Sequence, residues 1–123
     1  MEFDVVSGRV IGCAIEVHRH LGPGLLESVY RRCLLHELAD AGLRAEGERA
    51  VRIRYKGIDF ECGYRVDILV EDELIVELKA VDALLAIHEA QLLTYLKLSG
   101  LKTGLLVNFN SRSLRKGIRR LVL

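Results

Sequence analysis

The stretch YRVDILVEDELIVELK, which runs from Tyr64 to Lys79, decides the fold of this chain. Apolar and polar residues alternate on both sides of the acidic segment 71–73, a pattern typical of two antiparallel strands joined by a tight turn. The apolar residues of the first strand then share one face: Tyr64, Val66, Ile68 and Val70. Matching the apolar faces of both strands gives three cross-strand pairs: Val70 with Leu74, Ile68 with Val76, and Val66 with Leu78. A shift of one residue would mix the faces, so this register is strongly favoured.

The same register brings two acids and a lysine together on the opposite face. Asp67 lies across from Glu77, with Cβ atoms about 5 Å apart, and Lys79 points the same way two residues further on. Facing carboxylates repel each other unless a cation lies between them, and Mg²⁺ and Mn²⁺ prefer such oxygen ligands. A lysine beside the metal can orient water or stabilise charge on a phosphate. The hairpin therefore predicts a metal site suited to phosphodiester hydrolysis; the alternative is a solvated face neutralised by Arg65 and Lys79.

Net charge alone does not indicate a nucleic-acid-binding protein, because the 123-residue chain carries a formal charge of +1. The basic residues are nevertheless unevenly distributed. One group near the end of the sequence contains no intervening acid: Arg112, Arg115, Lys116, Arg119 and Arg120. Together with Arg52 and Arg54, this group is predicted to contact the phosphate backbone of a nucleic acid. An ordinary basic tail is the alternative.

Separated cysteines argue against a cysteine-based metal site or a disulfide framework: the chain has Cys13, Cys33 and Cys62. We expect each to be a small buried apolar residue. The first residues, MEFDVVSGRV, are neither basic nor continuously apolar, so they do not resemble a signal peptide. No apolar run is long enough to cross a bilayer. These features together predict a reducing, cytoplasmic setting.

The rest of the sequence predicts helices around a mixed sheet. Helical spacing of apolar residues indicates helices at roughly 4–20, 25–41 and 83–99. A two-residue turn at Lys56-Gly57 would add a strand to the hairpin and complete a three-stranded antiparallel meander. The apolar run TGLLVNF, from Thr103 to Phe109, indicates a strand buried on both faces, and the preceding helix would connect it in a right-handed βαβ unit. The final segment LRKGIRRLVL fits either a short helix or an edge strand.

Two helices carry polar side chains that could join the same site. Glu27 begins the second helix, where the helix dipole favours a carboxylate, and it shares a face with Tyr30. The functional interpretation of Glu27 is a third acid aimed at the metal. On the third helix, Gln91 and Tyr95 share a face and could hold a water molecule or a phosphate oxygen. The simpler interpretation is a buried Tyr95 and an exposed Gln91, with His88 in a structural or surface position.

These segments together resemble the GxxExxY proteins of the PD-(D/E)XK nuclease superfamily, with motifs similar to the RecB-like branch. The resemblance covers nearly the whole chain and rests on four stretches: LGPGLLESVY, YRVDILVEDELIVELKAV, HEAQLLTYL and TGLLVNF. It implies a single nuclease-like domain over 1–123, with a restriction-endonuclease-like α/β core in which helices flank a mixed central sheet. One departure is Val66, which stands where the motif has proline, and the chain is close to a bare core without an obvious DNA-recognition domain.

The resemblance also implies roles for individual residues. The implied catalytic set is Glu27, Asp67, Glu77, Lys79, Gln91 and Tyr95. Within it, the metal ligands would be Asp67, Glu77, the main-chain carbonyl of Leu78, and Glu27. Lys79 would position or activate the attacking water, while Gln91 and Tyr95 match the Q-x-x-x-Y that such enzymes place beside the metal. His18 fits the family pattern without an assigned role.

Two classes of function follow from these observations. The first is an Mg²⁺- or Mn²⁺-dependent nuclease that hydrolyses phosphodiester bonds in DNA or RNA, with DNA favoured. The second is a non-catalytic module that binds nucleic acid or protein on a nuclease fold, a reading that small size and near-neutral charge would suit. The intact set of two acids and a lysine favours the enzyme. A homodimer would help so small a nuclease to cover both strands, although no sequence feature indicates one.

Overall fold

The computed structural model describes residues 4–123, so residues 1–3 of the predicted domain lie outside the described part. The elements follow in the order α1 (Val5–Leu21), α2 (Glu27–Asp40), β1 (Ala45–Tyr55), β2 (Ile58–Val70), β3 (Leu74–Lys79), α3 (Ala86–Ser99), β4 (Thr103–Asn108), the 3₁₀-helix η1 (Leu114–Gly117) and β5 (Ile118–Val122). The helices and strands predicted from the sequence are therefore confirmed, and the final segment forms both a short helix and an edge strand. Within residues 4–123, no helix is long and apolar enough to span a membrane.

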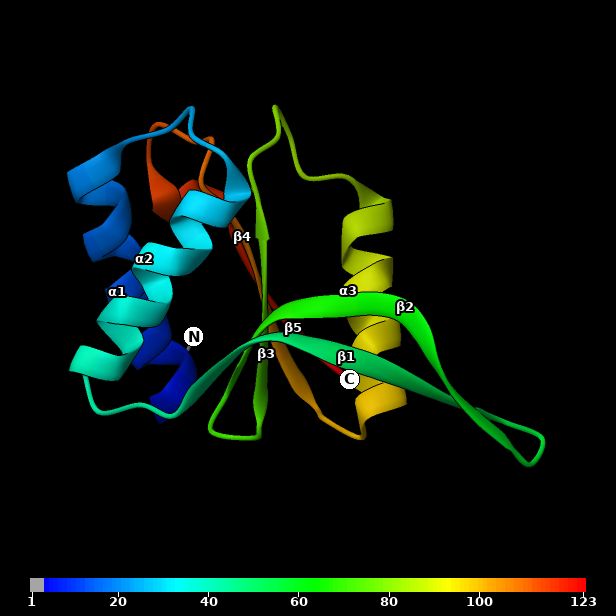
Figure 1. Ribbon diagram of the computed structural model, residues 1–123. Helices are drawn as coiled ribbons and strands as arrows, with labels where there is room; N and C mark the ends of the chain where they lie inside the picture. The colour runs from blue at the N-terminus through cyan, green and yellow to red at the C-terminus, as the bar shows by residue number, and fades with distance from the viewer. Residues whose placement is uncertain (1–3) are drawn as a thin grey trace.

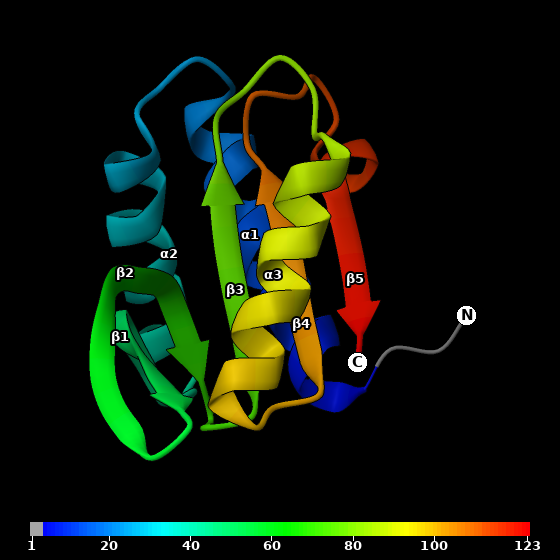
Figure 2. The ribbon, with the colours of Figure 1, turned by 90° about the vertical axis from the view of Figure 1, so that its right-hand side faces the viewer.

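The strands form one mixed sheet in the order β1-β2-β3-β4-β5. β3 and β4 are parallel, and every other neighbouring pair is antiparallel. Helices α1 and α2 cover one face and α3 covers the other, as Figures 1 and 2 show from two directions. This arrangement confirms the predicted α/β class and is consistent with a restriction-endonuclease-like fold. Because β3 and β4 run in parallel, their carboxyl ends meet at the same edge of the sheet (Figure 2).

Two apolar clusters, one on each face, hold the helices against the sheet. The side chains of β4 alternate between them: Leu105 and Val107 join the cluster under α1 and α2, while Leu106 joins the cluster under α3. All three are fully buried, which confirms the predicted strand with two covered faces. Glu77 and Asn108 are buried in the same central region, with relative exposures of 2% and 3%. Buried polar groups of this kind need hydrogen-bond partners.

One part of the predicted strand geometry is wrong. Ile68 and Val70 belong to the cluster under α1 and α2, but Val66 is buried in the cluster under α3, with Tyr64 packed against it. The pairing of β2 with β3 covers residues 68–70 on β2, so the expected pair of Val66 with Leu78 does not form. The change of face falls between Val66 and Ile68, where the pairing of β2 with β3 begins and where Glu48 of β1, across from Asp67, has a φ of 54°. A separate bulge shifts the register between the pairs Ala50–Arg65 and Arg52–Glu61, where Gly63 has a φ of 84°, and such a bulge increases strand twist.

Beyond the bulge, β1 and β2 continue as a two-stranded ribbon that projects past α3 (Figure 1). Lys56 and Gly57 form its turn with φ values of 46° and 89°, and Tyr55 pairs with Ile58, as predicted. Cys62 lies exposed on this ribbon, and Cys13 and Cys33 are half-buried, so the expectation that all three cysteines are buried is wrong. The exposure of Cys62 follows from the ribbon having no helix over this section. The three cysteines are free thiols.

Candidate metal centre

The predicted acid pair occupies the gap that opens where β2 leaves β3. The carboxylate of Asp67 accepts the main-chain N–H of Leu78 at 2.8 Å, and the carboxylate of Glu77 accepts the main-chain N–H of Asp67 at 3.0 Å. Each acid thus crosses to the opposite strand and takes the place of a missing main-chain hydrogen bond. The two carboxylates are brought together as the sequence predicts, but each is bonded to the neighbouring strand's backbone.

Glu77 is the acid of this centre whose ionised form is disfavoured by its surroundings. Its side chain is almost completely buried, and Oε2 accepts the hydroxyl of Tyr64 at 2.5 Å. Burial and the nearby charge of Asp67 raise the pKa of Glu77 to about 7, against an ordinary value of 4.5. Hydrogen bonds and the charge of Lys79 act in the opposite direction without cancelling the rise. A further positive charge at this point would favour the ionised carboxylate.

Tyr64 is a site residue that the sequence analysis missed. Its ring stacks on Tyr95 of α3 with centroids 4.4 Å apart and planes 16° apart, so β2 and α3 together hold the hydroxyl on Glu77. Burial raises the pKa of both tyrosines, and the charge of Glu77 acts in the same direction. Tyr95 therefore reaches the acid pair through Tyr64. The signal in the sequence was a tyrosine near Asp67, hidden because its position fitted the apolar alternation.

Lys79 is half-buried at the last residue of β3, and Asn108 secures the chain that follows it. The carbonyl of Lys79 accepts the N–H of Phe109 at 2.8 Å. The buried amide of Asn108 accepts the N–H of Val81 at 3.1 Å and donates to the carbonyl of Val81 at 2.9 Å. The end of β4 and the residue after it thus hold the backbone at Lys79 and at Val81. Asn108 was also missed, although a lone polar residue inside the run TGLLVNF was a usable signal.

Glu27 lies at the first residue of α2, where it is half-buried. Tyr30, one turn later, is fully buried: its hydroxyl donates to the carbonyl of Gly22 at 2.6 Å and accepts the N–H of Leu25 at 3.1 Å. Tyr30 therefore braces the loop before α2. Among residues 4–123, no group of three His, Cys, Asp or Glu side chains lies close enough to hold a metal ion. Direct metal coordination by Glu27 thus stays a prediction.

An arginine that the sequence analysis did not consider contacts the acid pair. Arg31 of α2 lies one helical turn after Glu27, the spacing that could have indicated it. Its guanidinium reaches Asp67 Oδ1 at 3.2 Å through Nη1 and Glu48 Oε1 at 3.2 Å through Nη2. The side chains of Arg31 and Asp67 are only 23% and 15% exposed, so solvent screens this ion pair less than one on the open surface.

The remaining helix residues are arranged as their simpler interpretation predicts. Gln91 is exposed, whereas Tyr95 is buried. His88 Nδ1 accepts the N–H of Leu85 at 2.9 Å and so caps the start of α3. His18 Nε2 lies 2.7 Å from the carbonyl of Ser111 and links α1 to the segment after β4. Both histidines therefore have structural partners.

The predicted basic strip is divided over several surfaces. Arg119 lies 3.9 Å from Glu89 of α3, whereas the next residue, Arg120, lies 2.9 Å from Asp4 beside α1. The two residues point to opposite faces because they are neighbours in the edge strand β5. On the ribbon, Arg52 is paired with Asp59 at 3.1 Å. The other exposed members of the predicted basic set are Arg54 on the ribbon and, around η1, Arg112, Arg115 and Lys116.

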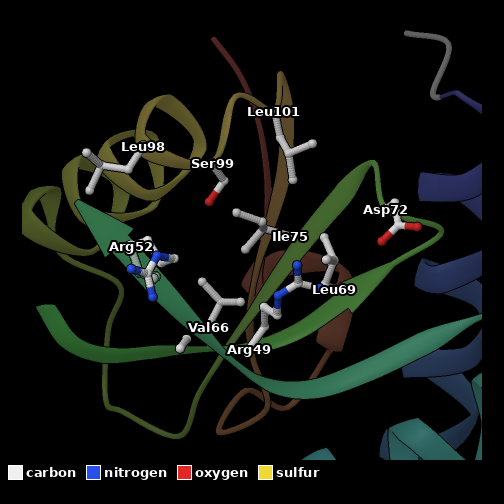
Figure 3. Close-up of a pocket in the computed structure, with 11 residues that line it drawn as sticks. Arg49, Arg52, Val66, Leu69, Asp72, Ile75, Leu98, Ser99 and Leu101 are labelled. Atoms are coloured by element: carbon white, nitrogen blue, oxygen red, sulfur yellow. The ribbon is translucent and has the colours of Figure 1, made fainter. Parts of the chain in front are cut away.

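A separate pocket of about 300 Å³ lies between β1, β2 and the end of α3 (Figure 3). Its floor is apolar and includes Val66 and Ile75, and the side chains of Arg49 and Arg52 lie at its rim. Asp67, which follows Val66, does not line it. The acid pair therefore lies outside this pocket, in the gap between β2 and β3.

The mixed sheet with helices on both faces, and the two acids and lysine at its centre, define a nuclease-type domain. In agreement with this class, the sequence model of the PD-(D/E)XK nuclease superfamily matches residues 4–121. The chain belongs to the PD-(D/E)XK nuclease superfamily, whose nucleases generally use divalent metals. Comparisons with curated proteins and with solved structures gave no match.

Proposed function

We propose that this protein is a divalent-metal-dependent nuclease that hydrolyses phosphodiester bonds, with DNA as the first substrate to test and RNA as the second. The observation that carries the proposal is the crossed bonding of Asp67 and Glu77 in the gap between β2 and β3, with Lys79 two residues further along β3. Membership of the nuclease superfamily supports the same reaction class.

The donor atoms of the acid pair fit a hard cation. Asp67, Glu77 and the main-chain carbonyl of Leu78 would supply oxygen ligands to Mg²⁺ or Mn²⁺, and Glu27 would contribute through a water molecule. The raised pKa of Glu77 supports this assignment, because it reports negative charge that the protein itself does not fully neutralise. When bound, the cation supplies charge stabilisation and a more acidic water.

The protein residues then have distinct tasks. Lys79 would orient the attacking water or stabilise charge on the scissile phosphate. Tyr64, supported by Tyr95, holds Glu77 in place, and Asn108 holds the backbone after Lys79. Gln91 would contact the substrate from α3. The exposed basic residues would hold the phosphate backbone at a distance from the centre: Arg54, Arg112, Arg115 and Lys116.

Calorimetric titration of Mn²⁺ and Mg²⁺ tests the metal site directly. Wild type should bind the cations, and the double variant Asp67→Ala, Glu77→Ala should not bind while keeping its circular dichroism spectrum. A matched double variant of surface acids, Asp59→Ala, Glu61→Ala, should bind as wild type does, since both acids lie on the exposed ribbon. Equal binding by wild type and the Asp67, Glu77 variant would refute the proposed site.

A cleavage screen then tests the reaction. Single- and double-stranded DNA and RNA, linear and circular, should be offered with Mn²⁺ and with a chelator. Metal-dependent loss of intact substrate that disappears in Lys79→Ala would support the nuclease. Metal binding without cleavage of any substrate would favour the alternative, a non-catalytic module that binds nucleic acid or protein. One observation favours that alternative: Asp67 is already neutralised by Arg31.

A further inference from the structure

Arg31 places a positive charge at the acid that the proposed function assigns to the metal. Its Nη1 atom lies 3.2 Å from Asp67 Oδ1, while Oδ2 of the same carboxylate accepts the N–H of Leu78. Both oxygens of Asp67 are thus engaged by the protein. Four charged residues are predicted to form the site: Glu27, Asp67, Glu77 and Lys79. Within residues 4–123, the ion pair between Arg31 and Asp67 is the one that involves any of them.

A divalent cation bound by Asp67 would meet this guanidinium at close range. Two positive charges on one carboxylate oxygen repel each other strongly where solvent screens them poorly. Arg31 can yield without losing every partner, because its other terminal nitrogen is paired with Glu48, whose side chain is 62% exposed. The exposed end of this ion pair gives the arginine a direction in which to move. Asp67 cannot move in the same way, since its main chain and side chain are both bonded to β3.

We propose that Arg31 couples metal binding to nucleic-acid binding; the inference rests on the proposed function. In the metal-free protein Arg31 is the counter-ion of Asp67. When the cation takes Asp67, the guanidinium is released to a backbone phosphate of the substrate, which its planar set of donors can bind with two parallel hydrogen bonds. Metal and nucleic acid then favour each other's binding. The phosphate draws Arg31 away from Asp67, where it competes with the metal, and the metal draws Asp67 away from Arg31, where it competes with the phosphate.

The metal arm of the test is a Mn²⁺ titration of wild type, Arg31→Met and Arg44→Met. Removing Arg31 removes the competitor, so Arg31→Met should bind Mn²⁺ about 5- to 20-fold more tightly than wild type. Arg44→Met is the matched control: it also deletes one positive charge, but Arg44 pairs with Glu71 in the turn after β2. Its affinity for Mn²⁺ should equal that of wild type. An arginine that merely supports the structure would give the opposite result, a weaker site in Arg31→Met.

The nucleic-acid arm uses fluorescence anisotropy of a labelled 12-mer DNA in the Lys79→Ala background, in which cleavage is expected to be absent. Mn²⁺ should tighten binding of this oligonucleotide about tenfold, and adding Arg31→Met should remove most of that gain. Arg31→Lys keeps the charge but not the two parallel donors, so it should retain wild-type Mn²⁺ affinity and lose part of the gain. Circular dichroism checks that each variant is folded.

The outcomes separate this inference from the proposed function. If wild type binds Mn²⁺ but Arg31→Met binds it equally or more weakly, the coupling is overturned and the nuclease proposal stands. The same holds if the Mn²⁺-dependent gain in oligonucleotide affinity survives in Arg31→Met. If wild type binds no Mn²⁺, the proposed metal site itself fails, and the coupling fails with it.

Discussion

The gap between β2 and β3 and the basic periphery differ in how their charged groups are held. In the gap, Glu77 is buried and bonded to both Tyr64 and the backbone of Asp67. On the periphery, Arg52 is 58% exposed and pairs with acids of its own ribbon. Buried, hydrogen-bonded charges act at defined distances, whereas exposed pairs contribute little and are screened by salt. If the protein is the proposed nuclease, its chemistry should depend on a few central groups, while its affinity for nucleic acid should be spread over many weak peripheral contacts.

Lys79→Ala, a change in the central gap, should have the largest effect on cleavage of all the variants considered. If Lys79 orients water or stabilises charge on the phosphate, its loss should reduce kcat by about 10²- to 10³-fold, the range typical of losing one group that stabilises transition-state charge. Affinity for Mn²⁺ should remain, because the oxygen ligands are intact. Single-turnover cleavage and calorimetry measure the two quantities. Full activity in this variant would remove Lys79 from the mechanism.

Glu77→Gln tests the buried central charge through the pH dependence of the unfolding free energy. The folded protein binds the Glu77 proton more tightly than the unfolded chain, so stability should fall as pH rises from about 4.5 through about 7. The ionised side chain then costs about 3 kcal/mol above pH 8, and Glu77→Gln should recover most of it in the metal-free protein. Urea unfolding at several pH values measures this effect. Saturating Mn²⁺ should cancel the pH dependence in wild type, and the exposed Glu73→Gln should leave it unchanged.

Asn108→Ala tests whether the centre depends on its polar support. The variant leaves the N–H and carbonyl of Val81 without their buried partner, which should cost about 2 kcal/mol of unfolding free energy. Asn110→Ala is the matched control, because Asn110 Nδ2 reaches the carbonyl of Val81 only at 3.5 Å. Its cost should stay below about 0.5 kcal/mol. Equal destabilisation of the two variants would contradict the assigned role of Asn108.

Arg54→Ala, a change on the exposed basic periphery, should have the smallest effect, and it should act on the affinity for nucleic acid. If Arg54 contacts a phosphate, the slope of log affinity against log salt should fall by about 1, with a modest loss of affinity. Arg52→Ala should change the slope less, because Arg52 is already paired with Asp59. Filter binding over a salt series compares the two. A tenfold or greater loss from Arg54→Ala alone would show that the periphery is not a set of weak contacts.

The sequence was informative where one alternation governs one covered surface. The predicted pairs Ile68 with Val76 and Val70 with Leu74 form, because the apolar residues of the hairpin leave one good register, and this register brings Asp67 and Glu77 together. The prediction failed at Tyr64 and Val66, because the pairing of β2 with β3 begins only at Ile68 and the preceding apolar side chains pack under α3. Tyr64, Asn108 and Arg31 became site residues only through contacts with segments far away in the sequence. Such contacts depend on how helices and strands pack, which local patterns do not report.

The two hydrogen bonds between Asn108 and the backbone of Val81 have a consequence for the order of folding. The acids Asp67 and Glu77 are ten residues apart and belong to one hairpin, whereas Asn108 and Val81 are 27 apart and meet only when β4 has paired with β3. Parallel pairing across a helical crossover is a slow, long-range event compared with hairpin closure. A partly folded chain therefore carries both acids before the backbone after Lys79 is held. If the protein is the proposed nuclease, its activity should therefore return late in refolding, after most of the secondary structure has formed.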